Sequence, residues 1–142
     1  MEQIGMSPLE SWAGFWSSLG PETLDRLNDL AAPDLHFIDP FNNITGREQV
    51  KTLLQRMLRD LGTPSFVVLD WAMGAKGGYL RWDFAATIAG QRLSIEGMSE
   101  VGFTPEGRVV FHRDHWDAGG QVYARMPLLG LGIRLMRRRL SG

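Results

Sequence analysis

Three side chains of this 142-residue sequence have the types and the spacing needed for acid/base chemistry. Asp39 ends the apolar run of "FIDPFNNITG", residues 37–46. His112 and Asp114 stand two residues apart in "VVFHRDHWD", residues 109–117, where strict alternation places both on one face of a strand. In an apolar cavity, a carboxylate and an imidazole can each take up or release a proton near neutral pH.

Each of these residues also has an ordinary structural interpretation, and the sequence leaves both interpretations open. Asp39, followed by Pro40, can begin an Asx-turn that only reverses the chain. His112 and Asp114 can form a satisfied hydrogen-bonded pair without turnover, as most buried polar groups do. The two histidines of "HRDH" point to opposite faces of a strand, which argues against joint chelation. We therefore expect no metal site.

Composition excludes several classes of site. The sequence has no cysteine, which excludes disulfides, thiolate nucleophiles and cysteine-bound metals. It has no phosphate loop and no dinucleotide fingerprint, so we expect no cofactor, and nothing favours nucleic-acid binding. It lacks a signal-peptide pattern and any apolar run long enough to span a bilayer, which predicts a cytoplasmic protein. Apolar residues make up 44% of the chain, enough for the core of one domain.

Charge is distributed unevenly along the chain. All 16 acidic residues precede position 121, whereas residues 121–142 contain five arginines. Four apolar residues recur in this tail at helical spacing: Leu129, Ile133, Met136 and Leu140. We expect a basic amphipathic helix that packs on or near the mouth of a pocket. Contact of the tail with a membrane surface is the second, less favoured interpretation.

Periodicity places the helices before most of the strands. Ser7 and Glu10 have the spacing of a capping box at the start of a first helix. A second helix ends before Pro33, the short strand "DLHFIDP" follows, and "TGRE" has the signature of a capping box for a third helix. Four strands joined by short glycine-bearing turns are then predicted over residues 65–73, 79–88, 92–103 and 108–117.

This order of elements indicates the α+β class. We expect a curved antiparallel sheet wrapped around helices as a cone, with an internal pocket. The cone occupies residues 1–120, and the predicted C-terminal helix occupies residues 121–142. Such a cone encloses a pocket wherever the inward side chains leave space.

The sequence resembles the nuclear transport factor 2-like superfamily, in its ketosteroid isomerase and SnoaL-type polyketide cyclase branch. The motifs "FIDPFNNITGRE" and "GFTPEGRVVFHRDHWD" and the order of elements carry the resemblance, over roughly residues 8–120. It implies a cystatin-like α+β roll with Asp39 at the position of the isomerases' general base. The positions of their two oxyanion donors fall on Phe15 and Ser99, so the standard oxyanion hole is incomplete and the usual steroid isomerisation is doubtful.

The resemblance also implies which side chains line the pocket. On the last strand, His112, Asp114 and Trp116 should face inward, together with Val110. The other expected ligand-binding residues come from the first helix and from the middle of the sheet: Trp12, Phe15, Trp82, Phe84 and Ser99. A homodimer formed through the outer face of the sheet is a further implication.

Two functions remain open at this point. The first is a cofactor-free acid/base isomerase, cyclase or hydrolase that acts on a small hydrophobic ligand, carbonyl-bearing or polycyclic. Asp39 would be the base, with Asp114 and His112 as acid or electrostatic partners. An epoxide hydrolase is the weaker form of this hypothesis, because "RLSIEGM" lacks an Arg-x-Asp spacing. The second is a non-catalytic module that binds a hydrophobic ligand or a protein partner in the same cavity.

Overall fold

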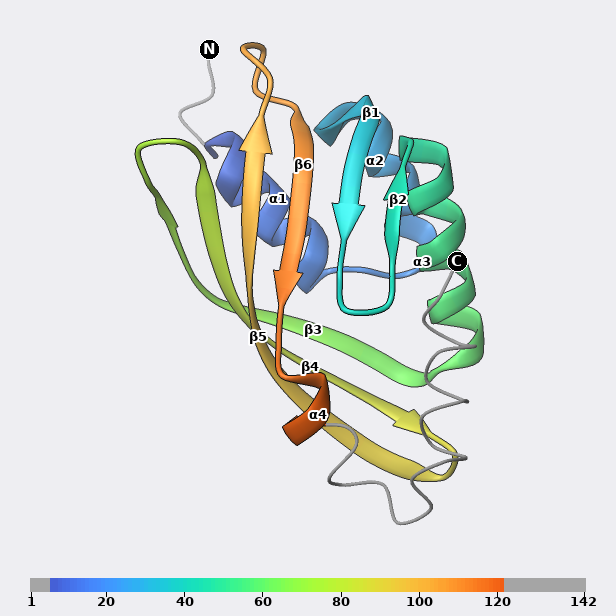
Figure 1. The fold of residues 1–142 in the computed structure, drawn as a ribbon. Helices are drawn as coiled ribbons and strands as arrows, with labels where there is room; N and C mark the ends of the chain where they lie inside the picture. The colour runs from blue at the N-terminus through green and yellow to red at the C-terminus, as the bar shows by residue number, and fades with distance from the viewer. Residues whose placement is uncertain (1–5, 122–142) are drawn as a thin grey trace.

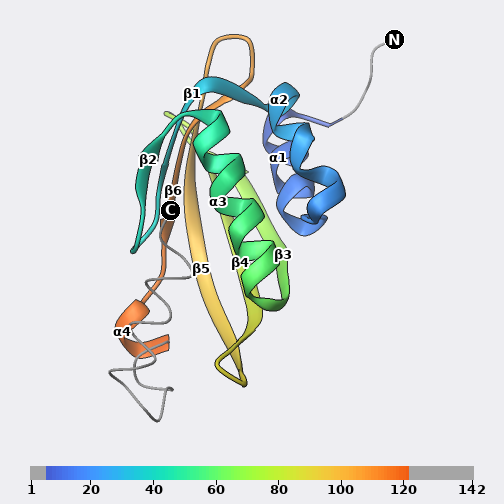
Figure 2. The same cartoon turned by 90° about the vertical axis from the view of Figure 1, so that its right-hand side faces the viewer.

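The structure, a computed structural model that describes residues 6–121, is a curved six-stranded sheet with its three longer N-terminal helical segments on one side (Figures 1 and 2). The helical elements are α1 (Pro8–Ser17), a 3-10 helix (Pro21–Arg26), α2 (Leu27–Leu30), α3 (Arg47–Asp60) and α4 (Ala118–Gln121). The strands are β1 (Ala31–Ile38), β2 (Asn43–Thr45), β3 (Gly62–Met73), β4 (Gly78–Ile88), β5 (Gln91–Phe103) and β6 (Val109–His115). The predicted α+β class and the four-strand meander are confirmed.

The sheet is mixed, which differs from the expected antiparallel sheet. Its strand order is β2-β1-β6-β5-β4-β3, and β1 pairs with β6 in parallel while the other neighbours are antiparallel. In this pairing Phe37 lies opposite His112 and Ile38 lies opposite Arg113. Asp39, which directly follows β1, and Asp114, near the end of β6, therefore lie at the same end of the two strands.

One of the two predicted capping boxes is present. The Ser7 hydroxyl accepts from the Glu10 amide, and the Glu10 carboxylate accepts from the Ser7 amide. The second prediction is wrong, because Thr45 is a strand residue opposite His36 and Gly46 takes the N-cap of α3. Gly46 has a φ of 118°, a backbone conformation that other residues rarely adopt, and this turn lets β2 run directly into α3.

A β-bulge shifts the start of β6. Phe111 pairs with Gly102 and Val109 pairs with Phe103, so Val110 is the extra residue. Val109 is consequently buried in the core, at 1% exposure. The prediction that Val110 shares the inner face with His112 is wrong, since the bulge breaks the alternation on which it depends.

The predicted helix of residues 121–142 lies outside the described residues except for Gln121, which ends α4. The Gln121 side chain exchanges two hydrogen bonds with the backbone of Glu96 in β5: its Oε1 accepts from the amide at 2.6 Å and its Nε2 donates to the carbonyl at 2.9 Å. This side-chain amide therefore extends the hydrogen bonding of β5 past the end of β6. Among the described helices, none is long and apolar enough to cross a membrane.

The outer face of the sheet carries both apolar and charged side chains. Three large apolar side chains on it, Val67, Tyr79 and Met98, are between 41% and 50% exposed. They lie among charged residues such as Arg81 and Glu96. Homodimerisation through this face, as the resemblance implies, stays a prediction.

The inner face depends on a close approach between Gly97 and the indole of Trp82, its cross-strand partner. A Cβ at Gly97 would lie 2.4 Å from the Trp82 ring. We expect Gly97→Ala to lower the free energy of unfolding by about 1–3 kcal/mol in a urea titration, because the indole must move within a packed core. Gly14→Ala is the matched control: its Cβ meets open space in α1, so it should stabilise by about 0.5–1 kcal/mol. Equal effects at the two sites would contradict this account of Trp82 packing.

Candidate functional site

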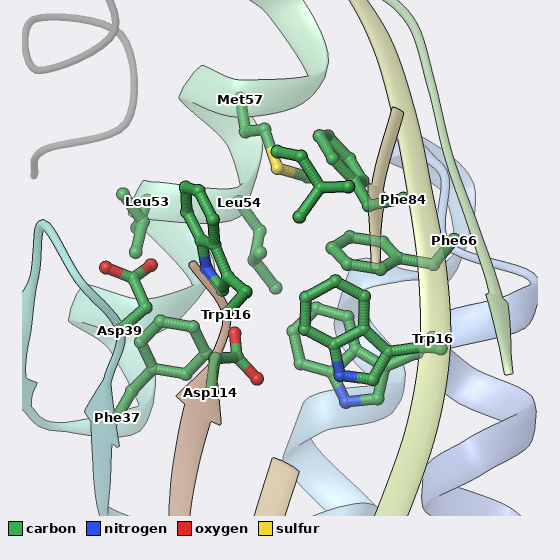
Figure 3. Close-up of a pocket in the computed structure, with 12 residues that line it drawn as sticks. Trp16, Phe37, Asp39, Leu53, Leu54, Met57, Phe66, Phe84, Asp114 and Trp116 are labelled. Carbon is green, nitrogen blue, oxygen red and sulfur yellow. The ribbon is translucent and has the colours of Figure 1, made fainter. Parts of the chain in front are cut away.

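An apolar cavity of about 60 Å³ lies between α3 and the concave face of the sheet (Figure 3). Its lining is dominated by six aromatic side chains: Trp16, Phe37, Phe66, Trp82, Phe84 and Trp116. Four aliphatic side chains complete the apolar wall: Leu53, Leu54, Met57 and Ile95. Among the lining residues that the structure describes, only Asp39 and Asp114 are charged, and both are acidic. Carboxylates in such surroundings are poorly hydrated, which makes them the reactive groups of the cavity.

Asp39 combines the two interpretations that the sequence left open. Its Oδ1 accepts from the amides of Phe41 and Asn42, at 2.8 and 2.7 Å, which is the Asx-turn. Burial, together with the negative charge of Asp114, nevertheless raises the pKa of Asp39 from 3.8 to about 6, against the lowering effect of these hydrogen bonds. The same carboxyl group therefore shapes the turn and titrates near neutral pH.

The two carboxylate oxygens of Asp39 differ in the hydrogen bonds that they accept. Oδ1 accepts three hydrogen bonds, since Asn42 Nδ2 also donates to it at 3.1 Å. Among residues 6–121, Oδ2 accepts only from the same Nδ2, at 3.2 Å. A carboxylate oxygen can accept more than one hydrogen bond, so Oδ2 keeps a free lone pair for a proton or a ligand.

Asp114 belongs to a chain of hydrogen bonds with a fixed direction. The Trp12 indole N–H donates to His112 Nδ1 at 3.0 Å, and the Trp82 indole N–H donates to Ser99 Oγ at 2.8 Å. Because an indole nitrogen can only donate, Nδ1 carries no proton and His112 is the neutral tautomer with a proton on Nε2. His112 Nε2 and Ser99 Oγ then both donate to Asp114 Oδ1, at 2.7 and 2.5 Å.

This chain of hydrogen bonds leaves His112 and Asp114 with different capacities to contact a ligand. Asp114 Oδ1 accepts both of these hydrogen bonds. His112 is 2% exposed and both its ring nitrogens are used within the protein, so it can orient Asp114 but has no nitrogen left for a ligand. Phe37 stacks on the imidazole with an interplanar angle of 3°, which fixes the ring further.

The predicted ligand-binding residues divide into three groups. Trp82, Phe84 and Trp116 line the cavity together with both acids. Ser99 lines a smaller cavity beside it. Trp12 and Phe15 line neither, which corrects the expectation: both are fully buried and stack on each other behind the cavity wall, with ring centroids 5.4 Å apart.

Sequence reasoning missed Trp16, the α1 residue that reaches the cavity in place of Trp12 and Phe15. Its position one turn after Trp12 signalled an inward side chain, but not which inward side chain stands nearest the hollow. Phe66 was also missed, although it precedes Val68 in the alternation of β3, and both are partly buried against the core. α3 contributes three of its four buried residues to the cavity wall: Leu53, Leu54 and Met57.

The donor set offers little to a metal ion. Within residues 6–121, no group of three or more histidine or acidic side chains is close enough to hold one. His115, which follows Asp114, points away and pairs with Glu100 at 2.6 Å. The chemistry that the described residues support at this site is therefore proton transfer by carboxylates.

Comparison with known proteins identifies the family of the fold. The family model of the SnoaL-like domain matches residues 12–112. No curated protein matches the sequence.

Three solved structures are similar to the chain. An LEH-like epoxide hydrolase from M. tuberculosis has 20% identity and a TM-score of 0.69, with 95% of this chain and 94% of that one covered. A steroid delta-isomerase from Pseudomonas aeruginosa has 22% identity and a TM-score of 0.60, with 94% and 88% covered. A protein with a ketosteroid isomerase-like fold from Catenulispora acidiphila, in complex with trimethylamine, has 16% identity and a TM-score of 0.67, with 81% and 88% covered. At these identities the likeness shows the fold alone.

The raised pKa of Asp39 predicts a pH-dependent stability. The folded-state pKa of Asp39, about 6, exceeds the ordinary value of 3.8. The contribution of Asp39 to the free energy of unfolding is therefore fully present below pH 4 and is lost as the pH rises through 6. Asp39→Asn should therefore become more stable than the parent above pH 7, by up to about 3 kcal/mol, while the two proteins converge near pH 4. Urea titrations between pH 4 and 8 measure the difference. Parallel stability curves for the two proteins would contradict the raised pKa.

The tautomer of His112 can be checked directly. Trp12→Phe removes the only donor to Nδ1 and leaves a buried acceptor unpaired, so the protein should lose about 1–3 kcal/mol of unfolding free energy. Nitrogen-15 NMR of the parent protein should show the His112 proton on Nε2. Trp71→Phe is the control, because Trp71 is 44% exposed and outside the cavity lining. A proton on Nδ1 in the parent would refute the direction of the hydrogen-bond chain.

Proposed function

The chain belongs to the SnoaL-like domain family, and we propose that it is a cofactor-free acid/base enzyme acting on a small hydrophobic ligand. The reaction is of the isomerase, cyclase or hydrolase kind, in which a proton is taken from one atom of the ligand and given to another. The observation that carries the proposal is a buried aspartate, Asp39, with a pKa of about 6 in an aromatic-lined cavity.

Asp39 is the general base of this proposal. A base is most effective when its pKa lies near the working pH, and burial moves Asp39 toward that range from its ordinary 3.8. Oδ1 is held by the turn amides, so Oδ2 is the oxygen that takes up the proton and returns it. The turn thus fixes the carboxylate without occupying both of its oxygens.

Asp114 and His112 support Asp39 in different ways. The negative charge of Asp114 raises the pKa of Asp39 and so strengthens it as a base. His112 is a positioning residue, because it touches Asp114 but has no free ring nitrogen.

The cavity supports a compact ligand. A volume of about 60 Å³ is below the roughly 150 Å³ of a cavity that holds benzene, so the ligand has a single small ring at most and is not polycyclic. The aromatic wall favours unsaturated or aromatic bodies, whose faces and edges pack on the tryptophan and phenylalanine rings. A carbonyl group beside the reacting carbon would make its proton acidic enough for Asp39 to remove.

A non-catalytic binding module is the second candidate. The observation that favours it is the completeness of the internal hydrogen bonding: Asp39 already serves a turn and Asp114 already receives two donors. Groups satisfied in this way are stable without turnover. The two candidates share a ligand site and differ in whether Asp39 moves a proton.

Replacing Asp39 separates the two candidates. Asp39→Asn retains the size of the side chain and an oxygen for the turn, so ligand binding should persist while turnover falls at least about a hundredfold. In the parent, kcat/KM should rise with pH through about 6, because the base must be ionised. Measurement requires a substrate found in a panel of compact enones, epoxides and polyketide fragments.

Asp34→Asn is the matched control for this test. Asp34 is an exposed residue of β1, the strand that precedes Asp39, and it should leave kcat/KM unchanged. Turnover that survives in Asp39→Asn would remove Asp39 from the mechanism. If the parent binds members of the panel but converts none, the binding module stands in place of the enzyme.

A further inference from the structure

A second, smaller cavity adjoins the first. Its volume is about 10 Å³, roughly the space that one water molecule, or one ligand oxygen, needs. The two cavities share part of their lining, including Trp16, Trp82 and Asp114. Ser99 and His112 line only the smaller one, although most of its exposed lining is apolar. A ligand body in the larger cavity would have this recess beside it.

The recess has a hydrogen-bond donor without a partner. Trp16 is 5% exposed, and its indole Nε1 is buried with no hydrogen-bond partner. The N–H groups of Trp12 and Trp82 are already used, by His112 and Ser99. Buried tryptophan N–H groups usually find a partner, since an unpaired donor costs stability. Trp16 therefore has a donor to offer to a ligand.

The recess also has an acceptor without a partner. The two donors to Asp114, from His112 and Ser99, both go to Oδ1. Oδ2 has no partner among the described residues, 6–121. In Figure 3 the Asp114 carboxylate lies between Asp39 and the indole of Trp16. One free donor and one free acceptor thus belong to residues that line both cavities.

We propose that Trp16 Nε1–H and Asp114 Oδ2 form a subsite for a hydroxyl group of the ligand. This inference rests on the proposal that the larger cavity holds the ligand, and it adds the chemical class of that ligand. The hydroxyl oxygen accepts from Trp16 and its hydrogen is donated to Asp114, so one atom satisfies both groups.

Other oxygen and nitrogen groups fit this pair less well. A carbonyl or ether oxygen can accept from Trp16, but it has no hydrogen to donate to Asp114 Oδ2. An ammonium group can donate to Asp114, but it has no lone pair for Trp16. The ligand class is therefore a compact hydrophobic alcohol or phenol, with its hydroxyl in the recess and its apolar body against the aromatic wall.

Binding of p-cresol and p-xylene tests the subsite. The two molecules differ by a hydroxyl in place of a methyl group, and their dissociation constants are measured by calorimetry or NMR titration without any reaction. Trp16→Phe keeps an aromatic ring but removes the N–H, so the preference for p-cresol over p-xylene should fall about tenfold relative to the parent. Phe84→Leu is the matched control, since it removes apolar contact for both ligands and should leave their ratio unchanged.

Asp114→Asn provides an independent variant. To accept from His112 and Ser99, the asparagine must place its oxygen at Oδ1, which puts its NH₂ group where Oδ2 was. Binding of p-cresol should then weaken about tenfold, whereas 4-methylanisole, which can only accept, should bind more tightly than in the parent. Circular dichroism of each variant confirms that the fold is retained.

Unchanged ligand ratios in both variants would overturn the subsite. So would a crystal structure with p-cresol bound in which a water molecule, and not the phenol, bridges Trp16 and Asp114. These outcomes are separate from the test of Asp39, because they concern binding alone. If the protein prefers the hydroxyl ligand but shows no turnover, the subsite proposal stands and the enzyme proposal fails. If turnover depends on Asp39 but the preference is absent, the enzyme proposal stands and the subsite proposal fails.

Discussion

The parallel pairing of β1 with β6 is the constraint on which the site depends. It places Phe37 opposite His112 and sets the ends of two strands, far apart in sequence, side by side. The carboxylates of Asp39 and Asp114 then enter one cavity from adjacent strands. Burial there raises the pKa of Asp39 to about 6, and the negative charge of Asp114 contributes to the rise.

Asp39 and Asp114 are the same residue type but differ in their hydrogen-bond partners. Asp39 receives backbone amides from its own turn and is buried, which leaves it with a pKa of about 6. Asp114 receives a neutral imidazole and a hydroxyl, each of them oriented by a tryptophan N–H. Two aspartates in one cavity therefore have different surroundings, and this difference is the basis on which we propose different roles for them.

The aromatic residues have two structural roles in this fold, apolar packing and hydrogen-bond donation. Some provide the wall of the cavity, as Phe84 and Trp116 do. Others, Trp12 and Trp82, use their N–H groups to fix the direction of the polar chain. Gly97 makes room for Trp82, since any side chain there would collide with its ring. Trp16 stands apart because it lines the wall and keeps its N–H unpaired.

Local pattern in the sequence determined the elements and the candidate acids. The Ser7 capping box, the turn that begins at Asp39 and the alternation of the meander strands all depend on neighbours a few residues away. The pairing of His112 with Asp114 also follows from spacing alone, because residues two apart share a face of a strand.

Only the tertiary structure decided what these groups do. The bulge at Val110, the choice of Trp16 over Trp12 and Phe15, and the burial of both His112 nitrogens depend on contacts between distant segments. Trp12 and His112 are 100 residues apart in the chain, so no local pattern signals that one assigns the tautomer of the other. Electrostatic roles arise from burial and from the partners of each group, and both are properties of the packed fold.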